Sequence, residues 1–277
     1  MTGLIGACLG TYQRRAWLEE CLASARAAAV GMPLRFYVAD GGSTDGTIVM
    51  LRSMPDVHLI EQGELLGAVA GFDAAYGAAI DDGADWIGTL NDDLTCCDDG
   101  PPIITAAVLR LAADPRLGGV AFASDRYATA PPDPFFGPFG PREVVTFRVE
   151  RHHGRPYLNQ GIVRRSAHMA VARAQGDPTG RDYWDRKYHT YGADSAAGCW
   201  LWRLGWQVAA ADDLRVCERM HGADDVYVGE TGDADPLRQI NMAKCGDTGA
   251  IFTADWGDPA RLEPCAADIA RFGGRLP

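Results

Sequence analysis

The sequence Leu34-Arg35-Phe36-Tyr37-Val38-Ala39-Asp40-Gly41-Gly42-Ser43-Thr44-Asp45-Gly46-Thr47 decides the fold class of this chain. Its apolar first part predicts a strand that ends at Asp40, and the glycines that follow permit positive φ and close approach of the backbone. Ser43, Thr44 or Asp45 can cap a helix that begins near residue 46 or 47. Open α/β sheets bind ligands at the carboxyl ends of their strands, although ordinary strand-to-helix turns share this composition. The surrounding sequence has to separate a binding loop from a plain turn.

Residues 1–90 alternate between short apolar runs and segments with helical periodicity. Predicted strands cover residues 4–9, 34–38, 57–60 and 86–90, and predicted helices cover residues 17–25, 48–51 and 67–80. Repeated strand–helix units favour a mostly parallel sheet with right-handed crossovers and helices on its faces. The sequence thus predicts an α/β fold.

The composition of the 277 residues excludes several classes of protein. No apolar run is long enough to cross a bilayer, so we expect no membrane span. A core strand is already predicted at residue 4, which leaves no room for a secretory signal. The eight cysteines show neither metal-ligand nor disulfide-framework spacing, and Cys96 and Cys97 are adjacent. We interpret them as buried free thiols of a cytoplasmic protein.

The predicted strand over residues 86–90 runs directly into Asn91-Asp92-Asp93. Two carboxylates at the end of a buried strand repel each other unless a cation lies nearby. Magnesium and manganese prefer such oxygen ligands and bind phosphate oxygens as well. A solvated acidic turn is the alternative, and Asp98-Asp99, which precede Gly100-Pro101, fit that description.

Four sequence blocks are more specific. They are Leu9-Gly10-Thr11-Tyr12-Gln13-Arg14, residues 38–47, Leu90-Asn91-Asp92-Asp93, and residues 159–166 followed by Tyr191-Gly192-Ala193-Asp194 and an apolar segment ending in Gly205-Trp206. In this order the blocks resemble the inverting nucleotide-sugar glycosyltransferases of family 2, which have the GT-A fold. The chain departs from the family pattern at Gly10, Gln13, Ala39, Ala193 and Ala196.

The resemblance implies a GT-A architecture in which a mostly parallel central sheet is flanked by helices. Residues 1–100 would form the Rossmann-like half that binds the nucleotide sugar, and residues 101–226 the acceptor half of the same domain. Residues 227–277 would form a C-terminal extension. Within that extension we expect short helices around residues 236–245 and 260–271, and in residues 125–140 an ordered loop near the site.

The resemblance also implies a role for each matching position. Asp194 corresponds to the base that removes the proton of the acceptor hydroxyl, and Asp93, with His221, to the ligands of Mn²⁺ or Mg²⁺. The implied contacts of the nucleotide sugar, which would carry UDP, GDP or dTDP, are Thr11, Tyr12, Arg14, Asp40, Gly41, Gly67 and Asp92. The implied acceptor contacts are Asn159, Gln160, Gly161, Trp184 and Tyr191. Inversion by direct displacement needs a base and a stabilised leaving group but no protein nucleophile.

The acceptor itself is less defined. Residues 148–189 contain nine Lys and Arg and four Asp and Glu, a net charge of +5 in a chain of −11, with tyrosines interleaved. This segment suits an anionic acceptor, such as a hydroxymethylated nucleic-acid base or a phosphorylated lipid carrier, unless its charges disperse on folding. A neutral glycan, a small molecule or a protein side chain is the alternative. A GT-A-like module that binds sugar nucleotides without catalysis is a further one.

Overall fold

The computed structural model describes residues 3–98, 100–124, 151–152, 155–156, 158, 160–189, 192–218, 244, 248–257 and 262–275. Within these residues, eight strands form one mixed sheet in the order β3-β2-β1-β4-β9-β6-β10-β5. The strands are β1 (Ile5–Thr11), β2 (Leu34–Asp40), β3 (Val57–Glu61), β4 (Trp86–Thr89), β5 (Leu94–Cys96), β6 (Leu117–Ser124), β9 (Gly161–Arg164) and β10 (Gln207–Glu218). A short pair, β7 (Arg151–His152) and β8 (Arg155–Pro156), lies apart from this sheet.

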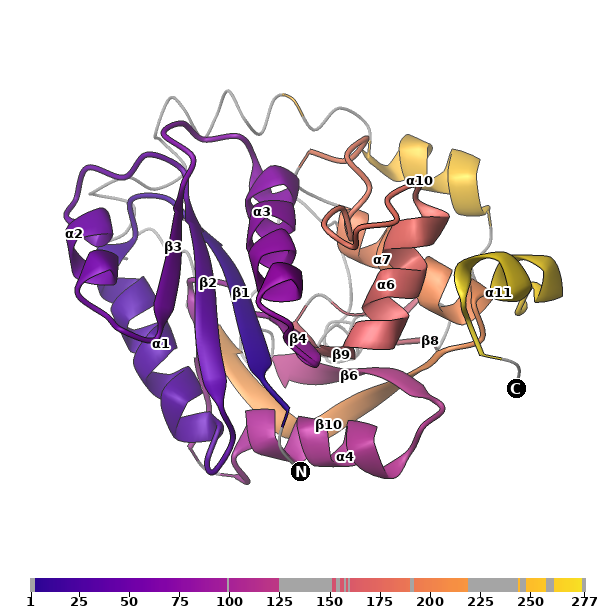
Figure 1. The fold of residues 1–277 in the computed structure, drawn as a ribbon, viewed down its shortest axis with the longest axis horizontal. Coiled ribbons are helices and arrows are strands. Elements are labelled where there is room, and N and C mark those ends of the chain that lie inside the picture. The colour runs from indigo at the N-terminus through magenta and orange to yellow at the C-terminus, as the bar shows by residue number, and fades with distance from the viewer. Residues whose placement is uncertain are drawn as a thin grey trace, which may run out of the picture.

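Helices cover both faces of the sheet (Figure 1). They are α1 (Arg15–Ala28), α2 (Thr47–Arg52), α3 (Ala68–Asp81), α4 (Ile103–Ala113), α6 (Arg165–Ala174), α7 (Ala193–Arg203), α10 (Thr248–Trp256) and α11 (Ala266–Phe272). Side chains of neighbouring strand residues point to opposite faces, so Phe36 of β2 joins the core under α1, α2 and α4. Its neighbour Tyr37 joins the core under α3, α6 and α7.

Every strand and helix predicted for residues 1–90 is present. The strands β1, β2, β3 and β4 are mutually parallel, as the alternation of strand and helix requires. The carboxylate of Asp45 accepts hydrogen bonds from the backbone N–H and the hydroxyl of Thr47, and so caps α2. The predicted α/β fold with a mostly parallel sheet is therefore confirmed.

The second half of the sheet breaks the parallel pattern. β9 runs antiparallel between β4 and β6, and β5 runs antiparallel to β10. β10 spans twelve residues and pairs with β6 in parallel, with register shifts along the pair. Among the described helices, α11 overlaps the predicted helical segment 260–271 and ends one residue beyond it, whereas α10 was not predicted. The predicted loop over residues 125–140 and the predicted helix over residues 236–245 fall outside the described residues, apart from Lys244.

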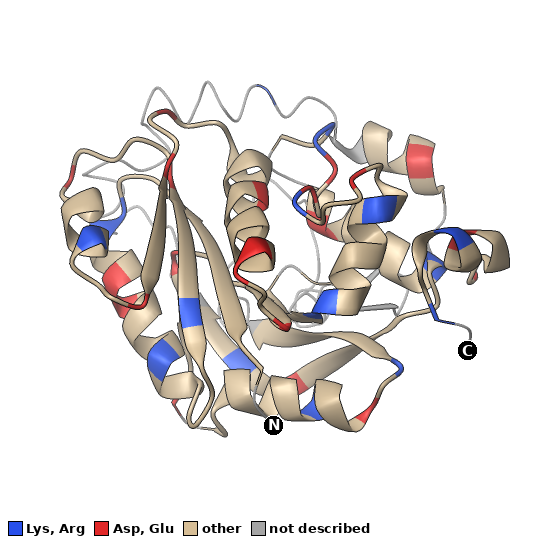
Figure 2. Cartoon of the chain, in the orientation of Figure 1, with Lys and Arg blue, Asp and Glu red and all other residues tan. Residues whose placement is uncertain are grey.

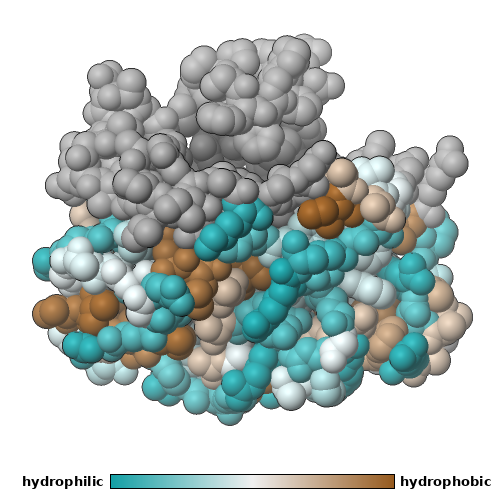
Figure 3. All heavy atoms as spheres, turned by 90° about the horizontal axis from the view of Figure 1, so that it is seen from above, coloured by the Kyte–Doolittle hydropathy of each residue, from teal (hydrophilic) through white to brown (hydrophobic). Residues whose placement is uncertain are grey.

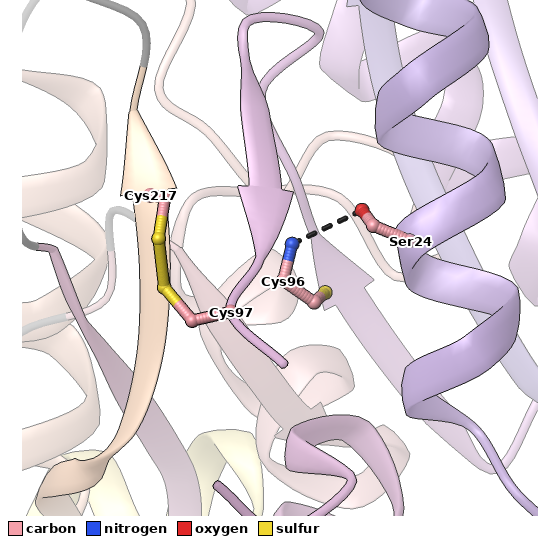
Figure 4. The surroundings of a disulfide bond; sticks show 4 residues. All are labelled: Ser24, Cys96, Cys97 and Cys217. Atoms are coloured by element: carbon pink, nitrogen blue, oxygen red, sulfur yellow. Dashed lines mark hydrogen bonds between the residues drawn. A yellow bond between two sulfur atoms is a disulfide. The ribbon is translucent and has the colours of Figure 1, made fainter. Parts of the chain in front are cut away.

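A disulfide corrects the interpretation of the cysteines. Cys97, just after β5, is bonded to Cys217 near the end of β10, across 120 residues of sequence (Figure 4). The neighbouring Cys96 is a buried free thiol whose backbone N–H donates to the Ser24 hydroxyl at 3.0 Å. The Cys96 side chain lies in the core with residues of α1, whereas the Cys97 sulfur is bonded to Cys217 of β10. No helix in the described part of the chain is long and apolar enough to cross a membrane.

Candidate functional site

Asp40 lies at the carboxyl end of β2, next to Thr11 at the end of β1. Its side chain is fully buried, and Oδ1 accepts the backbone N–H groups of Gly42 at 2.9 Å and Ser43 at 2.8 Å. Oδ2 is also buried, and it has no hydrogen-bond partner within the part of the chain that the structure describes. Because a buried carboxylate oxygen without a donor is costly, this atom is a candidate to accept an N–H from a ligand.

A second cluster at this edge joins Arg14 to the two aspartates that follow β4. Arg14 Nη1 lies 2.5 Å from Oδ1 of Asp92 and 3.1 Å from Oδ2 of Asp93. The hydroxyl of Thr11 donates to Oδ2 of Asp92 at 2.8 Å. Both oxygens of Asp92 are engaged and its side chain is 6% exposed, whereas that of Asp93 is 16% exposed. Asp93 is therefore the carboxylate that a ligand reaches more readily. We call Thr11, Arg14, Asp40, Asp92 and Asp93 the carboxyl-edge cluster.

The carboxyl-edge cluster suits a divalent cation in the type of its atoms, because Mg²⁺ and Mn²⁺ bind carboxylate oxygens. Its charge is partly neutralised already, since Arg14 pairs with both aspartates. Across the described residues, no three His, Cys, Asp or Glu side chains gather as a metal site. The predicted ligand His221 falls outside the described residues. A cation held here would thus depend on oxygen atoms of its substrate as well as on Asp93.

Gln13 is a residue of the site that the sequence identified only as a departure from the family pattern. It has a φ of 55°, which is rare for a residue with a side chain. Its backbone N–H donates to the Ser43 hydroxyl at 2.8 Å, and its amide exchanges hydrogen bonds of 2.9 and 3.1 Å with Thr44. Gln13 thereby ties the loop after β1, which carries the buried Tyr12, to the loop after β2.

The predicted glycines lie where backbone segments approach closely. Gly41 donates its N–H to the carbonyl of Thr11 at 3.0 Å, and a Cβ there would lie 3.0 Å from Leu65. Gly67 precedes α3 with a φ of +94°, and a Cβ there would lie 2.6 Å from the ring of His189. His189 was not singled out by sequence, since nothing local to residue 189 indicates that it contacts residue 67.

β9 carries the predicted acceptor residues Gln160 and Gly161 to the same edge. Gly161 pairs with Thr89, the last residue of β4, because β9 runs antiparallel to β4. Gln160 is buried, and its carbonyl accepts the N–H of Phe122 on β6 at 2.9 Å. A Cβ on Gly161 would overlap the Val120 carbonyl. The structure therefore places Gly161 close to the strand that leads into Asp92 and Asp93.

Asp194 lies in the first turn of α7, where a negative charge favours the helix dipole. Gly192, in the left-handed conformation, precedes the helix, and no side chain caps its first turn. Asp194 is half-buried and close enough to Tyr183 to raise the pKa of that phenol, after burial itself. The predicted acceptor residues Asn159 and Tyr191 fall outside the described residues.

Trp184 lies in the core, with 4% of its surface exposed and its ring 4.5 Å from that of Phe72 on α3. The structure gives this ring a packing role, and its predicted contact with an acceptor stays a prediction. The basic residues near Trp184 in the sequence form ion pairs with aspartates: Arg181 pairs with Asp81, Arg186 with Asp182, and Lys187 with Asp185 and Asp255. Basic and acidic residues are likewise interspersed over the described chain (Figure 2).

A cavity of about 530 Å³ lies away from the carboxyl-edge cluster, beside Trp86 at the start of β4. Arg164 and Arg165 line it, but their guanidinium groups donate to carbonyls at the ends of helices. Arg164 binds the carbonyl of Leu111 on α4, and Arg165 binds that of Ile80 on α3 at 3.0 Å. These arginines thus donate hydrogen bonds to carbonyls at the ends of helices, and this role explains their presence without a ligand.

The surface seen from above, at the end of the sheet where the parallel strands finish, carries both hydrophilic and hydrophobic residues where it is coloured (Figure 3).

Solved structures with a similar fold include a mannosyltransferase and a glucosyl-3-phosphoglycerate synthase. The mannosyltransferase PcManGT from Pyrobaculum calidifontis, in complex with GDP-Man and Mn²⁺, has 17% identity and a TM-score of 0.58, covering 100% of this chain and 77% of its own. Glucosyl-3-phosphoglycerate synthase from Mycobacterium tuberculosis, with Mn²⁺, UDP and glucosyl-3-phosphoglycerate, has 14% identity and a TM-score of 0.50, covering 88% and 80%. S. aureus TarS 1–349 has 13% identity and a TM-score of 0.51, covering 93% and 74%.

At such identities these similarities show the fold, which is of the GT-A type. Among curated proteins, none matches the chain. The sequence profile of glycosyl transferase family 2 matches residues 7–174, which is more than half of the chain. The matched range includes all residues of the carboxyl-edge cluster. The chain belongs to glycosyl transferase family 2.

Proposed function

We propose that this protein transfers a glycosyl group from a nucleotide sugar to an acceptor hydroxyl, with inversion at the anomeric carbon. The carboxyl-edge cluster carries this proposal. It brings the buried Oδ2 of Asp40, which has no hydrogen bond to the described residues, and the partly exposed carboxylate of Asp93 to the carboxyl ends of β2 and β4, the two parallel strands that flank β1 in a family 2 fold. Parallel sheets of this kind bind nucleotides at that edge.

Asp40 would recognise the base of the donor. Its Oδ1 is held by two backbone N–H groups, so the buried Oδ2 would keep one orientation in which it accepts an N–H of the base. Uracil, thymine and guanine each offer a ring N–H next to carbonyl groups, whereas adenine and cytosine do not. UDP, dTDP and GDP sugars are therefore the donors to test. PcManGT was solved with GDP-Man and the mycobacterial synthase with UDP, which supports this choice.

Asp194 would act as the general base. In the transfer, the acceptor oxygen forms a bond to the anomeric carbon as the bond from that carbon to the diphosphate oxygen breaks. The acceptor proton passes to a carboxylate, which is the role proposed for Asp194 in the first turn of α7. Mn²⁺ or Mg²⁺, bound through Asp93 and His221, would supply positive charge to stabilise the departing diphosphate. Arg14, between the aspartates, keeps their side chains in one arrangement.

The acceptor carries a hydroxyl group, and the described residues favour neither an anionic acceptor nor a neutral one. Of the nine cations that motivated an anionic acceptor, Arg181, Arg186 and Lys187 are paired with aspartates. An exposed ion pair attracts a further anion much less than an unpaired cation does. We therefore propose transfer to a hydroxyl without assigning it to nucleic acid, a lipid carrier or a neutral glycan.

The test is a screen of UDP-, GDP- and dTDP-sugars with Mn²⁺, in which release of the nucleoside diphosphate is measured with and without a panel of acceptors. We expect one donor class to be turned over, and Asp194→Asn to lower transfer by at least ~10²-fold, the usual range for a lost general base. The matched control is Asp212→Asn, since Asp212 is an exposed residue of β10. Nucleotide binding without release of product from any donor would instead favour a binding module without catalysis.

A further inference from the structure

Residues 177–189 join α6 to α7 and pack along α3 of the first half of the chain; we call this segment the clasp. It begins after α6, and the next described residues open α7 with Asp194 in its first turn. At one end of α3, Arg181 of the clasp packs on Gly77 and pairs with Asp81. At the other end, the carbonyl of His189 accepts the N–H of Val69 at 3.2 Å. The clasp thus runs antiparallel to α3 and ends at Gly67.

Asp73 holds the middle of the clasp. Its side chain is 1% exposed, and Oδ1 accepts the backbone N–H of Trp184 at 3.1 Å. Arg186 approaches from the outer side, with Nε 3.5 Å from Oδ2, and also binds Asp182 of the clasp at 2.6 Å. Oδ2 is buried and makes no hydrogen bond to the described residues. One carboxylate therefore fixes both the backbone and a charged side chain of the clasp.

The buried carboxylate of Asp73 does not add to the stability of the folded protein near neutral pH. The pKa of Asp73 is raised to about 7, mainly by burial and also by Asp182, while the N–H of Trp184 and the charge of Arg186 oppose the rise. A raised pKa means that folding disfavours the ionised carboxylate, so a neutral residue of the same shape would be at least as stable near neutral pH. Buried charged groups that cost stability are found where position or specificity matters. The aromatic contacts of the clasp with α3 already supply its packing, through Phe72, Tyr76, Tyr183 and Trp184.

We infer that Asp73 is a positioning residue for the transfer reaction: it sets the register of the clasp on α3, and thereby the placement of His189 at Gly67 and of Asp194 in α7. The inference rests on the proposed function for the role of Asp194. Gly67 has a positive φ, and a Cβ added to it would lie 2.6 Å from the His189 ring. A shift of the clasp would therefore move His189 relative to Gly67, which is in the donor half of the fold. The same shift moves the start of α7, which follows within a few residues.

The experiment compares Asp73→Asn with Asp81→Asn. Both carboxylates lie on α3 and pair with an arginine of the clasp, but Asp81 is 51% exposed and its ion pair contributes little. Asparagine keeps the oxygen that accepts from Trp184 and removes the charge that faces Arg186. Arg186→Gln and Arg186→Lys form a second pair, which changes only a side chain that is 64% exposed and so carries little risk of misfolding.

Three measurements are made on each purified variant. Thermal unfolding measures global stability. Calorimetry with UDP or GDP and Mn²⁺ measures nucleotide affinity, and so shows whether the donor half is intact. Hydrogen exchange of peptides from residues 177–189 and 192–203 reports the clasp and α7 without any need for turnover. With the donor and acceptor that the wild type uses, kcat and the acceptor KM are then determined separately.

We expect Asp73→Asn to unfold no earlier than the wild type and to bind nucleotide within ~2-fold of it, while exchange in both peptides accelerates. Transfer should fall by ~10- to 10²-fold, as it does when reacting groups shift by about 1 Å. Arg186→Gln should show a smaller change in exchange and transfer than Asp73→Asn. Arg186→Lys should transfer at the rate of the wild type, and Asp81→Asn should match the wild type in every measurement.

Two results would overturn the inference. One is that Asp73→Asn behaves like Asp81→Asn in exchange and in transfer. The other is that its stability, nucleotide binding and transfer fall together, which indicates a purely structural role. If the wild type itself turns over no donor, the proposed function fails, and exchange still decides whether Asp73 holds the clasp and α7 in place.

Discussion

The guanidinium of Arg14 lies 2.5 Å from the carboxylate of Asp92, and both side chains are more than nine-tenths buried. A buried ion pair that also contacts Asp93 gives the carboxyl-edge cluster its own cation. Removal of one partner from such a pair leaves an uncompensated buried charge, which is strongly destabilising. Arg14 therefore stabilises the two aspartates whether or not a divalent ion binds.

Replacement of Arg14 should make this cluster depend on metal. We expect Arg14→Gln to unfold at a lower temperature than the wild type and to be stabilised more strongly by Mn²⁺ in the absence of nucleotide, because the ion then offsets the negative charge that Arg14 neutralises in the wild type. Thermal unfolding at several Mn²⁺ concentrations measures both effects. Arg15→Gln is the matched control, since Arg15 is exposed and adjacent. An equal response of the two variants to Mn²⁺ would show that Arg14 does not neutralise the aspartates.

Asp40→Asn should weaken nucleotide binding selectively. The substitution replaces the buried acceptor Oδ2 with an N–H₂ group, so an N–H of the base would meet a donor instead of an acceptor. Loss of a hydrogen bond to a charged group costs about 1.5–3 kcal/mol, or roughly 10- to 150-fold in affinity. Calorimetry with UDP, GDP, dTDP, ADP and CDP measures it.

Asp45→Asn serves as the control for Asp40→Asn. Asp45 lies in the same loop but is exposed to solvent, and its carboxylate accepts the N–H of Thr47 at the start of α2. We expect this variant to bind each nucleotide as the wild type does. Loss of affinity that is equal for ADP and UDP in Asp40→Asn would contradict recognition of a base N–H by Asp40.

The sequence predicts the first half of the fold well because its signals are local. The buried residues of α1, among them Trp17, Leu18 and Cys21, recur at helical spacing. The end of β2 is marked in the sequence by Asp40 and the glycines that follow it. Positions of the carboxyl-edge cluster follow from the ends of parallel strands, which share one edge of the sheet. Its pairing pattern does not follow, since the contact of Arg14 with both aspartates spans some 80 residues of sequence.

The second half of the chain shows what composition alone cannot predict. Trp184 and its basic neighbours are typical of a ligand surface, yet the ring is buried against Phe72 and the charges pair with aspartates of other elements. Burial is decided by which segment packs on α3, and that contact joins residues more than one hundred positions apart. For the same reason, no spacing rule connects Cys97 with Cys217.

Reduction of the Cys97–Cys217 disulfide should lower stability measurably. A cross-link that spans 120 residues restricts the unfolded chain strongly, and native disulfides contribute typically about 2–4 kcal/mol. We expect the double variant Cys97→Ser, Cys217→Ser to lose a similar free energy of unfolding and to be insensitive to added reductant. Urea unfolding with and without reductant tests this, with Cys265→Ser, at a free and partly exposed thiol, as the control. A wild type whose stability is unchanged by complete reduction would refute the prediction.

His168 should make the fold sensitive to mild acid. Its Nε2 lies 2.8 Å from the carbonyl of Gly180 in the clasp, its ring stacks on Tyr183, and it is fully buried. The pKa of His168 is lowered to about 4, mainly by burial and also by the charge of Arg165, while the hydrogen bond to Gly180 opposes the shift. In the unfolded chain the pKa of histidine is about 6.5, so between these values the unfolded state binds a proton that the folded state does not. Stability contributed by the neutral ring is present above pH ~6.5 and is lost as the pH falls toward 4.

The loss from this one group amounts to on the order of 3 kcal/mol at pH 4, from 1.36 kcal/mol for each unit of pKa shift. We expect His168→Gln, which keeps a donor for the Gly180 carbonyl but does not titrate, to lose less stability than the wild type between pH 7 and pH 4. Urea unfolding at several pH values in this range compares the two slopes. His58→Gln, at a side chain that is 40% exposed, should keep the slope of the wild type. Equal slopes for His168→Gln and the wild type would mean that protonation of His168 is not coupled to unfolding, and that another group causes any acid sensitivity of the clasp.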